Sequence, residues 1–274
     1  MLGCAAQVSR HTRAAYAKRR EGETAIGAAE TLLMQALGLD HLDLAPQKYY
    51  TRRFSDLEVA NRFGAEYFMP CKKRVLDTLA KLPHRTIRDH APAIRDMWDP
   101  TRAIKGEAVR NFDITDALEP FLDDDAKPEA AAEIGSAKKR FQAGDVVIRR
   151  LRSYLKEIAV VHTTAVLPSV GSSEFIVLRP NVDGLSAVTL MVFLRCPLVQ
   201  TILKWSQDGS NHPRFTEEDL LAIPVPDAVL SVQNKIDTLV RKAYDARREA
   251  ARLIEQAKKT VEDMIAGGTN RKGQ

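Results

Sequence analysis

Residues 232–265 read VQNKIDTLVRKAYDARREAARLIEQAKKTVEDMI, and the fold can be predicted outward from this stretch. Apolar and small side chains recur there at intervals of three and four residues, close to a heptad repeat, while most other positions are charged. A helix of this length, about 50 Å at about 1.5 Å per residue, is too long and too polar to be buried alone and needs a partner helix. The apolar seam consists of Val232, Ile236, Leu239, Ala243, Ala246, Ala250, Leu253, Ala257, Val261 and Met264.

Residues 1–45 offer that partner, with a similar but weaker register. Gly22 and Gly27 each cost roughly 1 kcal/mol of helix propensity, and Arg19 falls on a seam position. We expect the two terminal helices to pair as an antiparallel coiled coil. The seam of the first helix consists of Val8, Thr12, Ala15, Gly22, Ile26, Ala29, Leu33 and Ala36.

The segment between the helices has a mixed character. Short β-like runs and helical stretches follow one another in irregular order, which favours an α+β domain over a doubly wound sheet. The predicted organisation is an N-terminal helix over 1–45, a globular domain over 46–230, a C-terminal helix over 231–266 and a flexible tail over 267–274.

Local patterns predict individual elements of the globular domain. Proline at position 70 introduces one helix, and Pro197 predicts a break in another. The predicted strands are 48–54, 145–151, 158–163 and 175–178, and the predicted helices are 72–82 and 186–205.

Composition restricts the class of protein. The 274 residues carry 41 Lys and Arg against 36 Asp and Glu, a net charge of +5 that hints at a polyanionic partner. Charges interrupt every long apolar run, so no membrane span is predicted. Three widely separated cysteines fit a reducing compartment and not a disulfide framework. These features predict a cytoplasmic protein.

The small net charge conceals a strong partition. Residues 107–133 hold nine acidic side chains against two basic ones, whereas residues 138–156 hold seven basic side chains against one acidic. A located basic segment is a better guide to a polyanion than the average charge of the chain.

Catalytic motifs are missing from the sequence. It has no nucleotide-binding glycine loop, no paired cysteines or histidines at metal-ligand spacing and no nucleophile elbow. We interpret His84 and His90 as surface or capping residues and expect neither catalytic nor metal-ligating residues.

Two polar segments are candidates for binding. The run 149–156 follows a predicted strand and combines guanidinium groups with hydroxyls, which suits phosphates and base edges. A solvated strand end that faces the acidic segment explains this run equally well, and the polar loop 209–213 could be an ordinary connector.

Five segments in a fixed order carry a resemblance. They are 140–152, 172–180, 209–213, 215–226 and 233–236, and together they resemble the target-recognition domain of type I restriction-modification specificity subunits. Upstream, Leu32–Leu39 resembles the close of that family's conserved helix, and Arg62–Phe68 with Pro70 resembles the usual entry into its recognition domain. The resemblance spans about residues 28–265.

The resemblance implies a subunit that reads DNA and leaves catalysis to its partners. The family's plan alternates two recognition domains with two conserved helices, so this chain resembles a half-subunit with a single recognition domain. It implies binding to double-stranded DNA, to methyltransferase subunits that hold S-adenosylmethionine and to a restriction motor subunit, with pairing to a second copy or another half-subunit. The implied DNA-binding residues are Lys139, Arg140, Arg149, Arg150, Arg152, Ser153, Lys156, Ser210 and Asn211.

Three other interpretations remain open from the residues alone. The chain could be a divergent DNA methyltransferase or nuclease, a non-functional truncated remnant of a specificity subunit, or a coiled-coil scaffold beside which the basic segment is incidental.

Overall fold

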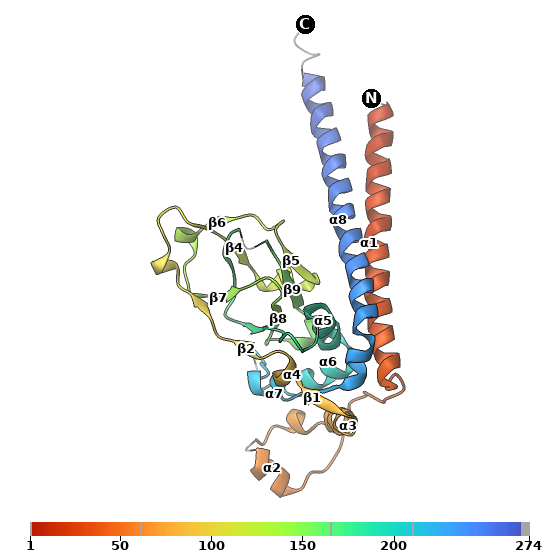
Figure 1. The fold of residues 1–274 in the computed structure, drawn as a ribbon, viewed down its shortest axis with the longest axis vertical. Coiled ribbons are helices and arrows are strands. Elements are labelled where there is room, and N and C mark those ends of the chain that lie inside the picture. Colours follow the sequence, from red (N-terminus) through yellow and green to blue (C-terminus); the bar gives the residue numbers. More distant parts are fainter. Residues whose placement is uncertain (1, 61, 165, 210, 270–274) are drawn as a thin grey trace. The chain divides into compact units, whose positions relative to one another are not determined.

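A computed structural model describes residues 2–60, 62–164, 166–209 and 211–269, with side chains described between residues 5 and 266. The chain divides into two compact units, Met1–Leu32 with Asn234–Gln274, and Leu33–Gln233. The first is a pair of long helices and the second mixes helices with strands, which confirms the predicted combination of α and β structure (Figure 1).

The helical unit contains most of α1 (Leu2–Leu37) and most of α8 (Asp227–Thr269). Within it the two helices run side by side in opposite directions (Figure 1). Glu21 of α1 pairs with Lys242 of α8 at 3.5 Å, and a Cβ added at Gly22 would lie 3.2 Å from the carbonyl oxygen of Ala243. Gly22 was predicted as a seam position that lowers the helix propensity of α1; in the structure its missing side chain permits the close approach of α8.

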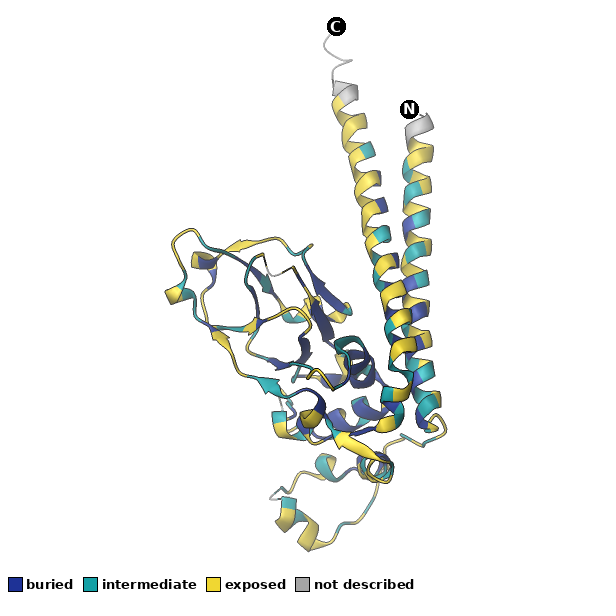
Figure 2. Cartoon of the chain, viewed as in Figure 1, coloured by how far each residue is buried: buried dark blue, intermediate teal, exposed yellow. Residues whose placement is uncertain are grey.

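Nine of the eighteen predicted seam positions are buried and six are half-buried, and Figure 2 shows buried residues along the facing sides of the helices. Thr12 is exposed, and Val240 is buried in place of the half-buried Leu239. Val261 and Met264 are exposed.

The end of α8 also differs from expectation. The sequence predicts a stop at Gly267 and Gly268, but the helix continues through both glycines to Thr269. Residues 270–274 of the predicted tail lie outside the described residues.

The mixed unit begins at the end of α1 and contains short helices. Two of them match predictions closely: the helix behind Pro70 and the helix broken at Pro197. The α-helices are α2 (Phe54–Ala60), α3 (Pro70–Ala80), α4 (Ile87–His90), α5 (Ala187–Arg195), α6 (Pro197–Lys204) and α7 (Glu217–Leu221), and the 3₁₀ helices are η1 (Ala65–Phe68), η2 (Pro100–Arg102), η3 (Ile114–Leu118), η4 (Ala131–Glu133) and η5 (Ser153–Leu155).

The strands of this unit form two five-stranded sheets and a two-stranded pair. Their orders are β3-β7-β10-β4-β6, β2-β11-β8-β9-β5 and β1-β12. The β10–β4 and β5–β9 pairs are parallel, and the other pairs are antiparallel. The strands are β1 (His84–Thr86), β2 (Ala93–Ile94), β3 (Met97–Trp98), β4 (Ala108–Phe112), β5 (Phe121–Asp123), β6 (Glu129–Ala130), β7 (Lys138–Phe141), β8 (Val146–Arg149), β9 (Ile158–His162), β10 (Ser169–Gly171), β11 (Phe175–Leu178) and β12 (Pro224–Pro226).

The core of the mixed unit lies between the two large sheets. Phe141 of β7 and Phe175 of β11 meet edge to face with ring centroids 5.9 Å apart. Gly171 of β10 makes room for them, because a Cβ at that position would lie 2.4 Å from the Phe141 ring. Strands β8, β9 and β11 alternate apolar side chains toward this core and toward their other face, where α5 packs beside β8 and β9.

Three predicted strands are confirmed as β8, β9 and β11, but the strand predicted over 48–54 is wrong. This segment has no regular structure until α2 begins at Phe54. Its alternating pattern lacks a buried face, since Lys48, Tyr49 and Arg53 are all exposed. Residues without a face to bury have no reason to join a sheet.

The glycines of α1 provide a test of the helix pairing. Substitution Gly22→Leu is expected to destabilise the protein by about 1–3 kcal/mol, because the new side chain must enter the contact with Ala243. The control Gly27→Ala meets nothing within 4 Å and is expected to stabilise α1 by up to about 1 kcal/mol. Chemical unfolding followed by circular dichroism at the helical band measures both changes. Equal stability of Gly22→Leu and wild type would contradict the pairing.

Candidate nucleic-acid interface

The loop after β8 has an unusual backbone. Among the described residues, Arg152 and Lys156 are the two non-glycine residues with positive φ, at 52° and 53°. They bracket the single turn η5, and neither side chain has an ion-pair partner among the described residues. Left-handed backbone at a non-glycine residue costs of order 1–3 kcal/mol and is concentrated at functional sites. This turn is therefore the first part of a candidate interface.

A second loop lies directly against the first. Leu151 and Arg214 form an antiparallel bridge, and the Arg152 amide donates to the Pro213 carbonyl oxygen at 3.4 Å. The structure thus brings together two polar segments that are well separated in the sequence. Asn211 and His212 are exposed at the second loop, and Ser210 lies outside the described residues.

Glu174 connects the two loops. Its carboxylate accepts hydrogen bonds from Arg150 Nε at 3.0 Å and from Arg214 Nε and Nη2 at 3.0 and 2.8 Å. These bonds lower the pKa of Glu174 from 4.5 to about 2, the bond from Arg214 contributing most. Both guanidinium groups stay partly exposed, with 43% of the Arg150 side chain and 38% of the Arg214 side chain accessible. The result is a fixed pair of cations, which we call the arginine pair, with donors left over toward solvent.

Two residues predicted to bind DNA lie inside the domain. Arg149 pairs with Glu157, and the exposed fractions of these side chains are 12% and 2%. Ser153 is buried as well. A buried ion pair needs both members, so the charge of Arg149 is used to balance Glu157 and is not presented at the surface.

The basic residues of β7 stand nearby. Lys139 is half-buried, and burial lowers its pKa, while Glu217 acts in the opposite direction. Arg150 and Arg95 also lower the pKa of Lys139, which places it electrostatically beside the arginine pair. Arg140 is exposed, with its Nε 3.6 Å from Asp96.

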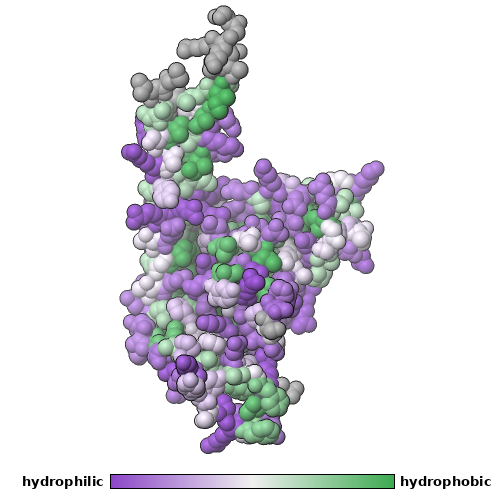
Figure 3. Space-filling view, turned by 180° about the vertical axis from the view of Figure 1, so that it is seen from behind, coloured by the Kyte–Doolittle hydropathy of each residue, from purple (hydrophilic) through white to green (hydrophobic). Residues whose placement is uncertain are grey.

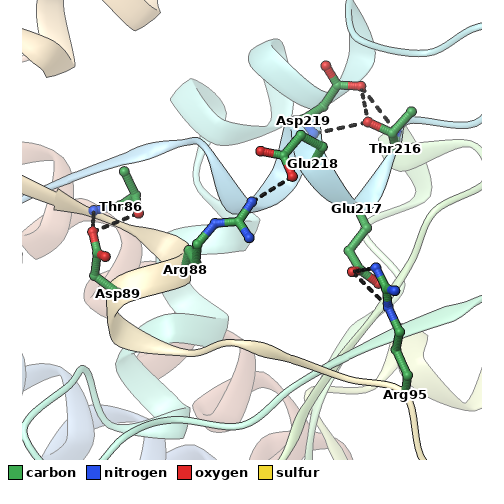
Figure 4. A network of polar contacts seen from close by, with 8 residues as sticks. All are labelled: Thr86, Arg88, Asp89, Arg95, Thr216, Glu217, Glu218 and Asp219. Atoms are coloured by element: carbon green, nitrogen blue, oxygen red, sulfur yellow. Dashed lines mark hydrogen bonds and ion pairs between the residues drawn. The ribbon is translucent and has the colours of Figure 1, made fainter.

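Helix α7 fixes arginines from the first hundred residues of the chain, as Figure 4 shows for Arg88 and Arg95. Thr216 and Asp219 form a capping box at its N-terminus. Glu217 pairs with Arg95 at 2.7 Å and Glu218 pairs with Arg88 at 2.6 Å. Asp219 also reaches Arg62 at 3.8 Å, so each acidic residue of α7 holds a different arginine.

Sequence reasoning missed Arg214 and Glu174. Glu174 is 24 residues from Arg150 and 40 residues from Arg214 along the chain. No local pattern reports a contact over such distances. The available signal was indirect: both residues lie inside or next to segments that carry the family resemblance.

The described residues contain no group of three His, Cys, Asp or Glu side chains placed to hold a metal ion. His84 is exposed and its Nδ1 lies 2.8 Å from the Leu82 carbonyl oxygen, as expected of a surface residue. His90 was expected at the surface but is fully buried, and neither ring nitrogen has a hydrogen-bond partner in the described part of the chain. Burial lowers the pKa of His90, since the neutral ring is the less costly form there.

In the described ranges, no single helix has the length and apolarity needed to cross a membrane. Helices α5 and α6 meet that requirement only as a pair bent by 64°.

Solved structures include a chain with a similar fold over most of this chain. No protein-family model and no curated protein matches this chain. A solved chain from work described as "Structural basis underlying complex assembly and conformational transition of the type I R-M system" is 16% identical, with a TM-score of 0.42. The match covers 93% of this chain and 55% of that chain, so this protein spans about half the length of its structural neighbour.

The pKa of Glu174 predicts a pH dependence. A carboxylate whose pKa falls on folding adds stability above its unfolded value, and this stability is lost as the pH falls from about 4.5 to about 2. Glu174→Gln is expected to lower the unfolding free energy by about 1–2 kcal/mol at pH 7. The difference from wild type should shrink as the pH falls through this window. A difference that is independent of pH in urea titrations would show that the carboxylate charge is irrelevant.

The buried ion pair between Arg149 and Glu157 predicts a loss of stability when one partner is removed. Arg149→Ala leaves the Glu157 carboxylate buried without its partner and is expected to destabilise the protein by about 3–5 kcal/mol. Arg152→Ala, which removes an exposed side chain of the same type, serves as the control and should change stability by less than about 1 kcal/mol. Thermal unfolding compares the two. Similar losses in both variants would contradict the assignment of Arg149 to the interior.

Proposed function

We propose that this protein is a sequence-specific DNA-binding specificity subunit of a type I restriction-modification system. In this function it recruits separate methyltransferase and restriction subunits to a DNA target and carries out no catalysis itself. One observation carries the proposal. The loops that contain the candidate residues meet through the Leu151–Arg214 bridge and form one cationic surface.

The chemistry of this surface suits duplex DNA. Arg152 and Lys156 offer unpaired charges for phosphates, and the arginine pair offers forked donors for phosphates or guanine edges. Asn211 is exposed at the adjoining loop and has the side chain that pairs with adenine through two hydrogen bonds. Lys139 and Arg140 extend the positive charge along β7. Arg149 and Ser153 support the loop from inside.

The sequence resemblance adds support of a different kind. The segment 140–152 contains the end of β7 and the whole of β8, 172–180 contains β11, and 215–226 contains α7 and β12. These segments supply Arg150, Glu174 and the acidic side chains of α7, and Arg214 directly precedes the last of them. Parts of the sequence that resemble a recognition domain thus coincide with parts that build the cationic surface.

The helical unit is assigned the role of spacer. We propose that α1 and α8 form an antiparallel coiled coil that holds two recognition domains at a fixed separation, the second supplied by another copy or another half-subunit. Their exposed charged sides would dock the methyltransferase subunits. S-adenosylmethionine would be bound by those subunits and not by this chain.

Substitution of the loop cations tests the DNA surface. Arg152→Gln with Lys156→Gln is expected to weaken binding to a pool of random-sequence duplexes, because two phosphate contacts are removed. The slope of log affinity against log salt should fall by about 2, or about 1 for each contact. The control Lys235→Gln with Lys259→Gln removes the same charge from exposed positions of α8 and should leave the slope unchanged. Fluorescence anisotropy across salt concentrations measures both.

The same experiment separates the alternatives. Sequencing of the bound duplexes should reveal an enriched target, and the absence of enrichment together with an unchanged slope would refute the proposed function. Transfer of labelled methyl groups or DNA nicking by the purified chain alone would instead support an enzyme.

A further inference from the structure

A cavity of about 560 Å³ opens beside the candidate interface in the mixed unit. Its walls are residues 62–67, which lead into and form η1, and residues 207–209. Asp208 belongs to the cavity wall and also bridges Arg214, with backbone hydrogen bonds of 2.9 Å in both directions. The cavity wall is therefore hydrogen-bonded, through Asp208, to the backbone of Arg214, which is one member of the arginine pair.

The cavity contains surfaces on which a flat ring can stack. The Arg62 guanidinium lies over the Tyr67 ring, 4.4 Å from its centroid. The Ser206 carbonyl oxygen and Asp219 hold that guanidinium in place. Lys72 Nζ lies 3.5 Å from the same ring centroid. Tyr67 and Arg62 thus form a fixed platform.

Phe63 supplies a second stacking surface. It also lines the cavity and is 74% exposed, although it is a large apolar side chain. Aromatic rings and guanidinium planes are the groups on which unpaired bases stack.

The polar groups of the walls match the edge of a base. Gln207 lines the cavity, and its Nε2 is buried without a hydrogen-bond partner among the described residues. Glu66 and Asp208 contribute carboxylate oxygens, which accept from amino groups. Adenine, cytosine and guanine carry such amino groups, whereas thymine does not.

The charge of the lining residues disfavours phosphate. Arg62 is the cation among them, and it stands against the carboxylates of Glu66 and Asp208. A neutral base can enter this environment, while the phosphates remain over Arg150, Arg152 and Arg214. The volume is within the range of small-ligand sites and is ample for one base.

From these observations we propose that the cavity receives an unpaired, amino-bearing nucleobase of DNA bound at the adjoining cationic surface. The inference rests on the proposed function and adds a site for a base outside the double helix. It predicts that a duplex with one unpaired adenine binds more tightly than the same duplex without it.

The test uses the full chain and four duplexes of otherwise identical sequence. One is fully paired, one carries a single bulged adenine, one a bulged thymine, and one a bulged abasic residue. Wild type is expected to bind the adenine bulge about tenfold more tightly than the abasic bulge, with the thymine bulge closer to the abasic. Fluorescence anisotropy gives the four affinities.

Phe63→Ala and Gln207→Ala should each reduce the preference for the adenine bulge and leave the affinity for the paired duplex unchanged. The control Phe54→Ala removes an equally exposed ring from α2, outside the cavity, and should keep the preference. Circular dichroism verifies that each variant folds.

Each outcome has a separate meaning. Equal binding of all bulged and paired duplexes by wild type would overturn the inference and leave the proposed function standing. A preference that survives both cavity substitutions would also overturn it, because the base would then lie elsewhere. If wild type does not bind even the fully paired duplex, the proposed function is refuted, and the inference with it.

Discussion

The carboxylate of Glu174 holds together the two loops that carry the arginine pair. It accepts from Arg150 at the end of β8 and from Arg214 in the adjoining loop, and so joins three segments. A carboxylate with two guanidinium partners stays ionised far into the acid range, which is why its pKa lies near 2. Glu174 is therefore ionised at neutral pH and holds Arg150 and Arg214 together there.

The same rule, that buried charge must be paired, sorts the other arginines into two groups. Arg149 forms an ion pair with Glu157, and Arg179 forms one with Asp145. Both pairs stabilise the sheet that contains β8. Arg152, which has no described acid beside it, remains available for a ligand. Proximity in sequence says little about this division, since Arg149 and Arg152 belong to one short basic run and serve opposite purposes.

Apolar side chains are buried in the sheets of the mixed unit but exposed on α2. Side chains of the mixed unit are well buried between its sheets, yet Phe54 and Val59 of α2 are exposed at 65% and 90%, and Figure 3 shows apolar side chains gathered over this helix. Helix α2 has no buried residue of its own. The cavity that we assign to a nucleobase lies in the segment that follows α2.

By itself the sequence determined the long C-terminal helix and its seam as far as Ala257, three core strands, the helix behind Pro70 and the break at Pro197. Each of these depends on neighbours a few residues apart. Only the tertiary structure decided that 48–54 forms no strand, that Gly22 lies against Ala243, and that Arg214 and Glu174 meet Arg150. Those outcomes depend on whether a partner lies opposite, and partners from 24 to more than 200 residues away leave no trace in local periodicity.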